Sequence, residues 1–361
     1  MATVSTLMPI TDVVALLAAR VSALVPDLLP QGNRRGAEWV CGDLTGAPGQ
    51  SLAVHMTGVK SGIWMDFAAG IGGDVLDLVA HARFGGDKKA ALWWARGYLG
   101  LDGPSVLPPA KLKAEAAAAI ARRDRDDAAD QEKRMRAARA IWLEAVPMGG
   151  TPAALYLEAR GITLAGLGGR WPGALRYHPD LWCGEASIRL PALVAAINGP
   201  DGQHIATHRT WIGPCANPPR PVVWRKALLT NPKLTLGTYA GGYIRLTRGG
   251  SGKPWTALDA SDTVAIAEGI ETALSVAVLV PEWRVLAAVS LANMGRLKLP
   301  PAARRIIVCA DNDRPGSPAA DGKERVLKHL LATGAEVRLA HPDIPYKDWN
   351  DQLIAEQADA S

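Results

Sequence analysis

The chain has 361 residues, of which 48% are hydrophobic and 21% are charged, a balance typical of a soluble globular protein with two or three domains. The most apolar stretch is interrupted by Glu268 and Glu271, which excludes a membrane span of ~20 apolar residues. The excess of 40 Lys+Arg over 35 Asp+Glu is too small to indicate a nucleic-acid partner on its own. Four scattered cysteines without a Cys-x-x-Cys pair predict reduced thiols and a cytoplasmic location.

Composition changes along the chain predict four segments. A Pro-rich break at 103–110 ends a small first domain, residues 1–102. The stretch 111–146 is rich in Ala and in charges of both signs and lacks Gly and Pro, so a long exposed helix is expected within a linker, residues 103–148. A β-rich segment (149–258) and an alternating segment (259–361) then follow.

The β-rich segment contains two strands around a GPDG turn, in SIRLPALVAAINGPDGQHIATHRTWIG, and an unusual charge distribution. Residues 202–258 contain no Asp or Glu. The basic residues of this window are Arg209, Arg220, Arg225, Lys226, Lys233, Arg245, Arg248 and Lys253, and its larger aromatic residues are Trp211, Trp224, Tyr239, Tyr243 and Trp255. Positive charge with interleaved aromatic rings favours a groove for single-stranded nucleic acid. The alternative is a basic β-rich domain whose aromatic rings lie in its core.

In the last segment, strands alternate with amphipathic helices, which predicts an α/β fold with a mainly parallel sheet, so the chain as a whole is α+β. The strand TVAIAEG delivers Glu268 at its end, and the strand RRIIVCAD delivers Asp311, followed by Asp313. Sites in such sheets gather beyond the carboxyl ends of the strands. Three carboxylates there form a hard oxygen site suited to Mg²⁺ or Mn²⁺. The alternative is that Asp-Asn-Asp is a solvent-exposed turn.

These motifs resemble the Toprim domain of primases and topoisomerases over roughly residues 262–353: VAIAEGIETALS, VCADNDRPG and YKDWND. The resemblance implies a Rossmann-like sheet in which Glu268 is the acid/base residue and Asp311 and Asp313 hold Mg²⁺. It also places Lys347 and Asp348 near the nucleotide or the metal.

The upstream half resembles the basic subdomain that precedes Toprim in bacterial DnaG-type, phage and plasmid primases, through ALRYHPDLW, HRTWI and RKALLTNP. In that family a lysine in the last of these segments meets template or nucleotide, which implies this role for Lys226. Together with the acid-free window, we expect Arg209, Arg225 and Trp211 to contact DNA as well.

Residues 62–95 resemble the zinc-binding domain of primases, in which an aromatic strand leads into GxGGD and a helix. The family's later Cys-x-x-Cys pair falls here on Asp66 and Ala69, and the earlier region offers only Cys41, with His55 nearby. A structural zinc site needs four ligands. We therefore expect a zinc-ribbon-like remnant without zinc.

The resemblance implies a primase that makes short RNA primers on single-stranded DNA from nucleoside triphosphates, in the replication of a plasmid, a phage or an integrated element. Because the chain stops soon after residue 353, any replicative helicase is expected to be a separate partner. A Toprim nuclease with the same metal site and a non-catalytic single-strand-binding protein are the alternatives. A topoisomerase is less consistent, since no further domain presents a tyrosine nucleophile.

Overall fold

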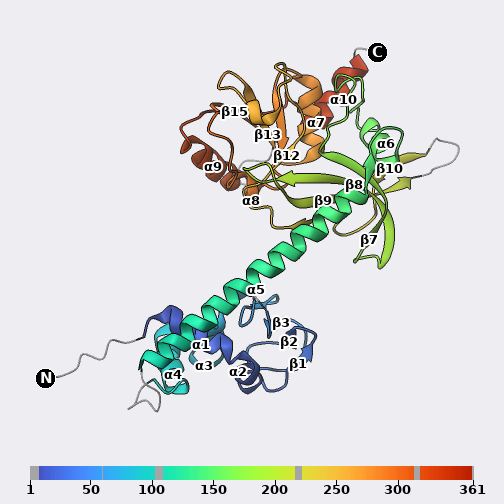
Figure 1. The fold of residues 1–361 in the computed structure, drawn as a ribbon. Helices are drawn as coiled ribbons and strands as arrows, with labels where there is room; N and C mark the ends of the chain where they lie inside the picture. The colour runs from blue at the N-terminus through green and yellow to red at the C-terminus, as the bar shows by residue number, and fades with distance from the viewer. Residues whose placement is uncertain (1–7, 59, 102–108, 216–221, 313–317, 360–361) are drawn as a thin grey trace. The chain divides into compact units, whose positions relative to one another are not determined.

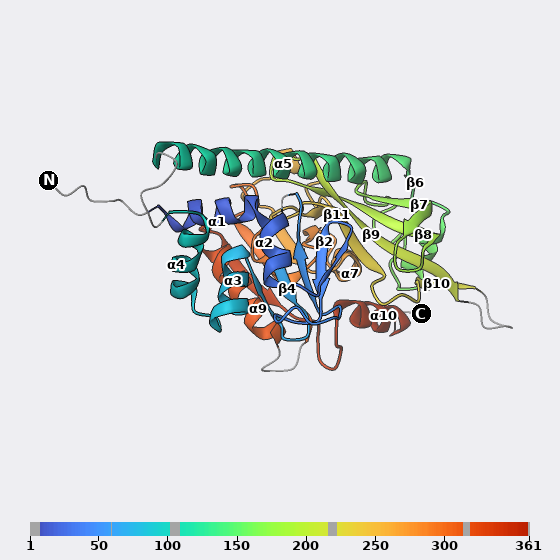
Figure 2. The ribbon, with the colours of Figure 1, turned by 90° about the horizontal axis from the view of Figure 1, so that it is seen from below.

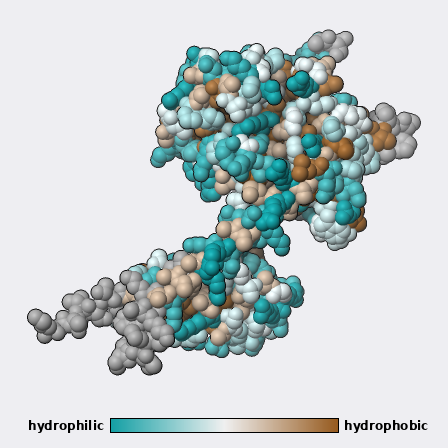
Figure 3. Space-filling model, in the orientation of Figure 1, coloured by the Kyte–Doolittle hydropathy of each residue, from teal (hydrophilic) through white to brown (hydrophobic). Residues whose placement is uncertain are grey.

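Our computed structural model describes residues 8–58, 60–101, 109–215, 222–312 and 318–359 (Figure 1). The chain divides into two compact units, residues 1–130 and 131–361. Helix α5 (Pro109–Glu144) runs from the first unit into the second and is the long helix expected from the sequence. Its visible face is largely hydrophilic in Figure 3, as its charged residues predict. Among the described residues, no helix combines the length and the apolar character needed to cross a membrane. The finer division into four segments stays a prediction.

The first unit is a small antiparallel sheet packed on helices. Its strands, joined in the order β1-β2-β3-β4-β5, are β1 (Asn33–Arg35), β2 (Glu38–Cys41), β3 (Leu52–His55), β4 (Trp64–Asp66) and β5 (Ile71–Gly73). Its helices, besides α5, are α1 (Ile10–Ala19), α2 (Val21–Leu28), α3 (Val75–Phe84) and α4 (Lys88–Tyr98). The Gly-Gly-Asp sequence explains the turn into α3: Asp74 caps the helix by accepting from the backbone N–H groups of Leu76 and Asp77.

The second unit begins with an antiparallel sheet, confirmed as β-rich. The sheet order is β10-β9-β8-β7-β6, and β11 also pairs with β9, as the adjacent ribbons in Figures 1 and 2 show. The elements are β6 (Val146–Pro147), α6 (Pro152–Glu158), β7 (Leu175–Cys183), β8 (Ile188–Asn198), β9 (His204–Cys215), β10 (Val223–Lys226) and β11 (Lys233–Gly237). Strands β8 and β9 flank the expected GPDG turn.

The second unit continues into a mainly parallel sheet, which confirms the α/β expectation. Its order is β12-β14-β13-β15-β16, and β12 alone is antiparallel. The elements are β12 (Ile244–Arg245), η1 (Trp255–Ala257), β13 (Thr263–Ala267), α7 (Ile270–Leu279), β14 (Arg284–Ala287), α8 (Leu291–Met294), β15 (Arg305–Cys309), α9 (Pro318–Leu331), β16 (Glu336–Ala340) and α10 (Trp349–Asp359). Strand β12 comes from the segment expected to be a separate basic subdomain, so the two sheets are not independent along the chain.

Alternation along the parallel strands divides the core of the second unit into two layers. Ala265 and Ala267 of β13 face a core that also contains α6, α7, α10 and one face of the antiparallel sheet. Val264 and Ile266 face a second core, built with α8 and α9 on the other side of the parallel sheet (Figure 1). The antiparallel sheet therefore packs against the parallel sheet through α7.

In the first unit, Cys41 and His55 do not converge on one site. Cys41 pairs with Leu52, whereas His55 pairs with Glu38, so the two candidate ligands are three ladder positions apart. That offset is roughly 10 Å along the strand, and an odd offset places side chains on opposite faces. Burial raises the pKa of the Cys41 thiol, which favours the protonated form over the thiolate that binds metal.

Asp66 shapes the turn between β4 and β5. Its Oδ1 accepts from the backbone N–H groups of Ala68 and Ala69, at 3.0 and 3.1 Å. A hydrogen-bonded aspartate turn therefore holds the link between β4 and β5.

We expect the purified chain to contain no stoichiometric zinc and to keep its fold in a strong chelator, because the packing around β1–β5 depends on apolar contacts and on the Asp66 turn. Metal analysis and circular dichroism with and without EDTA test this. One bound zinc per chain, or unfolding in EDTA, would contradict it.

Candidate active site

Two of the predicted carboxylates lie at one edge of the parallel sheet. Strands β13 and β15 are parallel neighbours, and Ala267 is in register with Cys309. Glu268 follows Ala267 directly, and Asp311 is two residues after Cys309. Both carboxylates therefore lie at the carboxyl edge of the sheet. Both also line one small cavity of about 40 Å³, with Lys323 beside them. The Lys323 ammonium donates to the backbone carbonyl of Asp311 at 2.8 Å, which places a positive charge next to the carboxylates.

The donor chemistry of this edge fits a hard divalent cation. Glu268 is exposed, Asp311 is half-buried, and their cavity is large enough for one ion or one water. Within the described ranges, no group of three or more metal-binding side chains is found. The third expected carboxylate, Asp313, lies outside the described residues, so the three-carboxylate set stays a prediction.

Asn312 connects this edge to the loop that carries Lys347 and Asp348. Its side-chain amide donates to the carbonyls of Pro342 and Tyr346, at 2.9 and 2.8 Å, and its backbone N–H donates to the Lys347 carbonyl at 2.9 Å. The segment after β15 and the loop before α10 are therefore held together.

Asp348 is the residue that starts α10. Its Oδ1 accepts from the backbone N–H groups of Asn350 and Asp351, both at 2.9 Å, which is the arrangement of a helix N-cap. This contact gives Asp348 a structural role, while its proximity to a metal stays a prediction.

A buried ionic cluster that the sequence analysis missed lies three residues beyond Glu268. Glu271, which is 7% exposed, accepts a hydrogen bond from the Tyr156 hydroxyl at 2.6 Å. Its two oxygens also face the ammonium groups of Lys226 and Lys233, at 3.2 and 3.0 Å. Glu271 is the single charged residue of the helix IETALSVAVL, and this was the available signal, since a charge on a buried helix needs a partner.

The cluster fixes the charge of its members. Burial by itself raises the pKa of Glu271, but Lys233 and Lys226, with the Tyr156 hydrogen bond, outweigh it and hold the pKa well below its usual range. Burial lowers the pKa of Lys226, and Glu271 opposes that effect. Burial and the same carboxylate raise the pKa of Tyr156, so its hydroxyl stays a donor. Two cations and one carboxylate therefore leave a net positive charge beside the carboxyl edge.

His208 packs beside this cluster as a neutral base. Burial and the charge of Lys233 lower its pKa from 6.5 to about 4, although the Glu271 carboxylate acts in the opposite direction. Its Nδ1 shares a hydrogen bond with the Thr235 hydroxyl at 3.0 Å. An extra proton on His208 would add a third buried cation to the cluster.

The predicted DNA-binding residues divide between the two faces of the antiparallel sheet. Lys226 is in register with Ile212, which faces the core shared with α7. Arg225 is in register with Gly213 of β9. Arg209 and Trp211 lie four and two residues before Gly213 in the same strand, so their side chains point to the same side as that of Arg225, the face opposite to Lys226. Arg209 is half-buried over the Trp211 ring, 5.2 Å from its centroid. One groove cannot be lined by Lys226 and by these three residues together.

The expectation that Trp211 stacks on DNA bases is corrected by the structure. Trp211 is 1% exposed, and its ring nitrogen donates to the Leu181 carbonyl at 3.3 Å. It lies in a core cluster that also contains Ile141 and Trp142 of α5. The ring is buried because β9 turns this face toward α5, so the alternative of a core aromatic holds for this residue.

Comparison with known proteins identifies the domain that carries the carboxylates. Residues 263–359 match the family model of the Toprim domain. This part of the chain is a Toprim domain. Its family match covers both Asp311 and Glu268, and its sheet supplies the shared carboxyl edge. Residues 132–246 match the model of a domain of unknown function, DUF7146, which covers the antiparallel sheet and Lys226. No match was found among curated proteins.

Several solved structures of primases are similar to this chain at low identity. The Aquifex aeolicus primase, with its zinc-binding and RNA polymerase domains, is 14% identical, with 95% of this chain and 82% of that chain covered and a TM-score of 0.36. The primase fragment of the bacteriophage T7 primase-helicase protein is 16% identical, with 59% and 80% covered and a TM-score of 0.32. The E. coli primase catalytic core is 15% identical, with 57% and 69% covered and a TM-score of 0.35.

The neutral state of His208 predicts a specific pH dependence of stability. The unfolded chain binds a proton at this residue below about pH 6.5, whereas the folded chain does so only near pH 4. The contribution of neutral His208 to the free energy of unfolding is therefore fully present above about pH 6.5. It declines as the pH drops toward 4, by roughly 3 kcal/mol in total. Urea unfolding of the wild type and of His208→Asn, which can keep the Thr235 hydrogen bond, should show a shallower decline in the variant.

The exposed His341 supplies the control for this measurement. His341→Asn should follow the wild-type pH profile. Equal slopes for the wild type and His208→Asn between pH 6.5 and 4 would contradict the assignment of a buried neutral histidine.

Proposed function

We propose that this protein is a DNA primase that joins nucleotides into short RNA primers on single-stranded DNA. The observation that carries the proposal is that two features lie close together along the chain at the carboxyl end of β13. Glu268 and Asp311 share a cavity at the carboxyl edge of the Toprim domain, and α7, which begins two residues after Glu268, contacts Lys226 and Lys233 of the antiparallel sheet through Glu271. Carboxylates for metal and cations for phosphate are the two requirements of nucleotidyl transfer.

In this proposal Glu268, Asp311 and Asp313 would hold Mg²⁺ or Mn²⁺. A bound cation of this kind supplies charge neutralisation for the nucleotide phosphates and the transition state. Glu268, whose carboxylate is exposed, accepts the proton of the attacking 3′-hydroxyl. Lys226 and Lys233, whose side chains are 31% and 34% exposed, keep N–H groups that can face phosphate oxygens.

The loop before α10 contributes the remaining part of the proposed site. Lys347 and Asp348 would lie beside the nucleotide or the metal, because Asn312 ties this loop to the segment that follows Asp311. The N-cap contact of Asp348 fixes the direction in which the loop enters the helix.

The proposed setting is the cytoplasm, in the replication of a plasmid, a phage or an integrated element. Single-stranded DNA and nucleoside triphosphates would be the substrates, and a separately encoded helicase would be the partner. All four cysteines are free thiols, which is consistent with a reducing compartment.

We expect Asp311→Ala to reduce primer synthesis by roughly 10²–10³-fold or more, because one carboxylate of the metal-binding edge is lost. The fold should persist, since the Lys323 contact uses the backbone carbonyl of this residue. The assay combines single-stranded DNA, labelled nucleotides and Mg²⁺ or Mn²⁺, and scores short products and template degradation. Asp351→Ala, which removes an exposed carboxylate of the same domain, should retain activity.

Primer synthesis by Asp311→Ala at the wild-type level would contradict the assignment of Asp311 to a metal site. Template degradation by the wild type without synthesis would instead indicate a Toprim nuclease. DNA binding with neither reaction would indicate a single-strand-binding protein.

We expect the template to pass along the β10 and β11 edge of the antiparallel sheet, where the side chains of Lys226 and Lys233 are partly exposed beside α7. Lys226→Gln should weaken DNA binding and reduce the slope of log K against log salt by about one. Arg225→Gln removes an exposed charge from the opposite face and serves as the matched control. Loss with Arg225→Gln and none with Lys226→Gln would move the template to the face of Arg209.

A further inference from the structure

A second cavity of the 131–361 unit lies away from the carboxylates and has a different chemistry. Its volume is about 390 Å³, within the range of small-molecule pockets. Arg245, Arg248 and His204 line it together with the rings of Trp142 and Trp255, and none of its lining residues is an Asp or a Glu. The cavity thus offers positive charge and aromatic surface without an internal counter-ion.

The backbone course places this cavity apart from the proposed catalytic edge. Ile244 is in register with Ala287, the last residue of β14, but β12 runs antiparallel to that strand. The chain then leads toward the start of β14, where Leu246 N–H donates to the Val285 carbonyl and Gly250 N–H to the Glu282 carbonyl. Arg245 and Arg248 are therefore carried away from the edge at which Glu268 and Asp311 emerge.

Arg245 is the central cation of the cavity. Its guanidinium lies 5.5 Å from the centroid of the Tyr243 ring and 6.0 Å from that of Trp255. Its Nε is buried, and among the described residues it has no hydrogen-bond partner. Because Nε is closed off from the cavity, an anion there would bind the terminal nitrogens of this guanidinium, whose charge and planar geometry suit phosphate.

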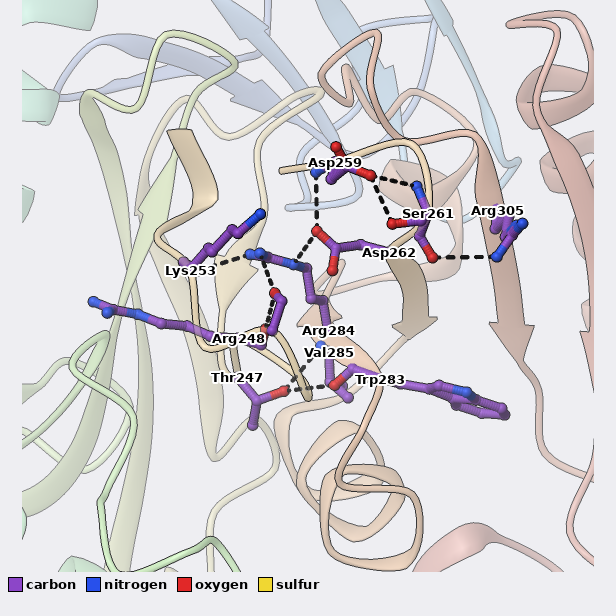
Figure 4. A network of polar contacts seen from close by, with 11 residues as sticks. Thr247, Arg248, Lys253, Asp259, Ser261, Asp262, Trp283, Arg284, Val285 and Arg305 are labelled. Carbon is purple, nitrogen blue, oxygen red and sulfur yellow. Dashed lines mark hydrogen bonds and ion pairs between the residues drawn. The ribbon is translucent and has the colours of Figure 1, made fainter. Parts of the chain in front are cut away.

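The cavity wall behind Trp255 is held rigidly by a separate network. Arg284, with a side chain 1% exposed, pairs with Asp262 at 2.9 Å and donates to the Lys253 carbonyl and the Ser251 hydroxyl, at 3.0 and 2.8 Å (Figure 4). These bonds fix the segment that leads into Trp255. In Figure 4 the Arg248 side chain extends away from this network, so its charge remains available to a ligand.

The opposite wall offers an oriented aromatic ring. Arg176 lies 3.7 Å from the centroid of the Trp142 ring and donates to the Trp142 carbonyl at 3.1 Å. His204 contacts the same ring edge-on, with centroids 5.6 Å apart. Trp142 is therefore fixed at the end of α5, and it is only half-buried. Arg176 covers one face of the indole, so a nucleobase would stack on its other, partly exposed face.

We propose that this cavity, which we name the Arg245 pocket (Trp142, His204, Arg245, Arg248 and Trp255), binds a nucleoside phosphate. The phosphate pairs with Arg245 and Arg248, and the base lies against Trp142. The ligand is either a free nucleotide or one nucleotide of a single strand, since both present the same phosphate and base. The site is distinct from the proposed metal edge and does not depend on the primase proposal.

The test measures binding to the full chain in EDTA, where binding that requires a divalent cation is suppressed. The probes are ATP, a ten-residue oligothymidylate and inorganic triphosphate. The double variant Arg245→Gln/Arg248→Gln should bind ATP or the oligonucleotide at least about tenfold more weakly, because hydrogen bonds from charged groups are lost. Loss for ATP identifies a free nucleotide as the ligand, and loss for the oligonucleotide alone identifies a strand.

Trp142→Leu separates a nucleotide site from a plain anion site. It should weaken the nucleoside probe and leave inorganic triphosphate binding unchanged. Arg189→Gln, which removes an exposed arginine of β8, should bind like the wild type. Should the double variant unfold in a thermal melt, the exposed Arg248→Gln alone should still show the loss.

Wild-type affinity of the folded Arg248→Gln variant for both ATP and the oligonucleotide would overturn the proposal. Equal effects of every variant on inorganic triphosphate and on the nucleoside probes would overturn base recognition. A loss of binding in Asp311→Ala equal to that of the double variant would assign the binding to the carboxyl edge instead.

Discussion

The buried carboxylate of Glu271 joins the two sheets of the 131–361 unit. It belongs to the first turn of α7, whereas the charges that neutralise it come from β10 and β11 and its hydroxyl donor from α6. A buried ion pair adds little stability over an apolar contact, but breaking one partner leaves an uncompensated charge. The cluster therefore restricts how the antiparallel sheet can pack on α7. Since α7 begins directly after Glu268 and Gly269, the same restriction aligns the basic sheet with the carboxylates.

A buried cation, Arg284, has a comparable role elsewhere in the same unit. Arg284 begins β14, and its contacts with Asp262, Ser251 and Lys253 attach the loop after β12 to the parallel sheet. In both cases a fully buried charge is satisfied by groups distant in sequence, so it specifies one arrangement of loops. The two clusters have different consequences. The two lysines around Glu271 leave a net positive charge near the carboxyl end of β13, whereas the Arg284 contacts support the wall of the Arg245 pocket.

The acid of the Arg284 network does not line the Arg245 pocket. Asp262, the acid that pairs with Arg284, is occupied by that guanidinium and by the Asp259 backbone N–H. Burial raises the pKa of Asp262, but that backbone hydrogen bond and the Arg284 charge together lower it below its usual range, so it remains an anion. Folding gathers two arginines of the acid-free stretch around this cavity and brings Lys226 and Lys233 together around Glu271. Arg209 and Arg225 belong to the other face of the antiparallel sheet.

The sequence by itself determined the parallel sheet, the position of Glu268 and Asp311 at strand ends, and the long helix. These features depend on local patterns: alternation, strand ends and helix propensity. The tertiary structure alone decided which basic residues share a face, because parity along β9 and its register with β10 separate Lys226 from Arg209, Arg225 and Trp211. It also decided that Trp211 is core and that Lys226 pairs with Glu271, since burial and ion pairing depend on contacts between residues far apart in the chain.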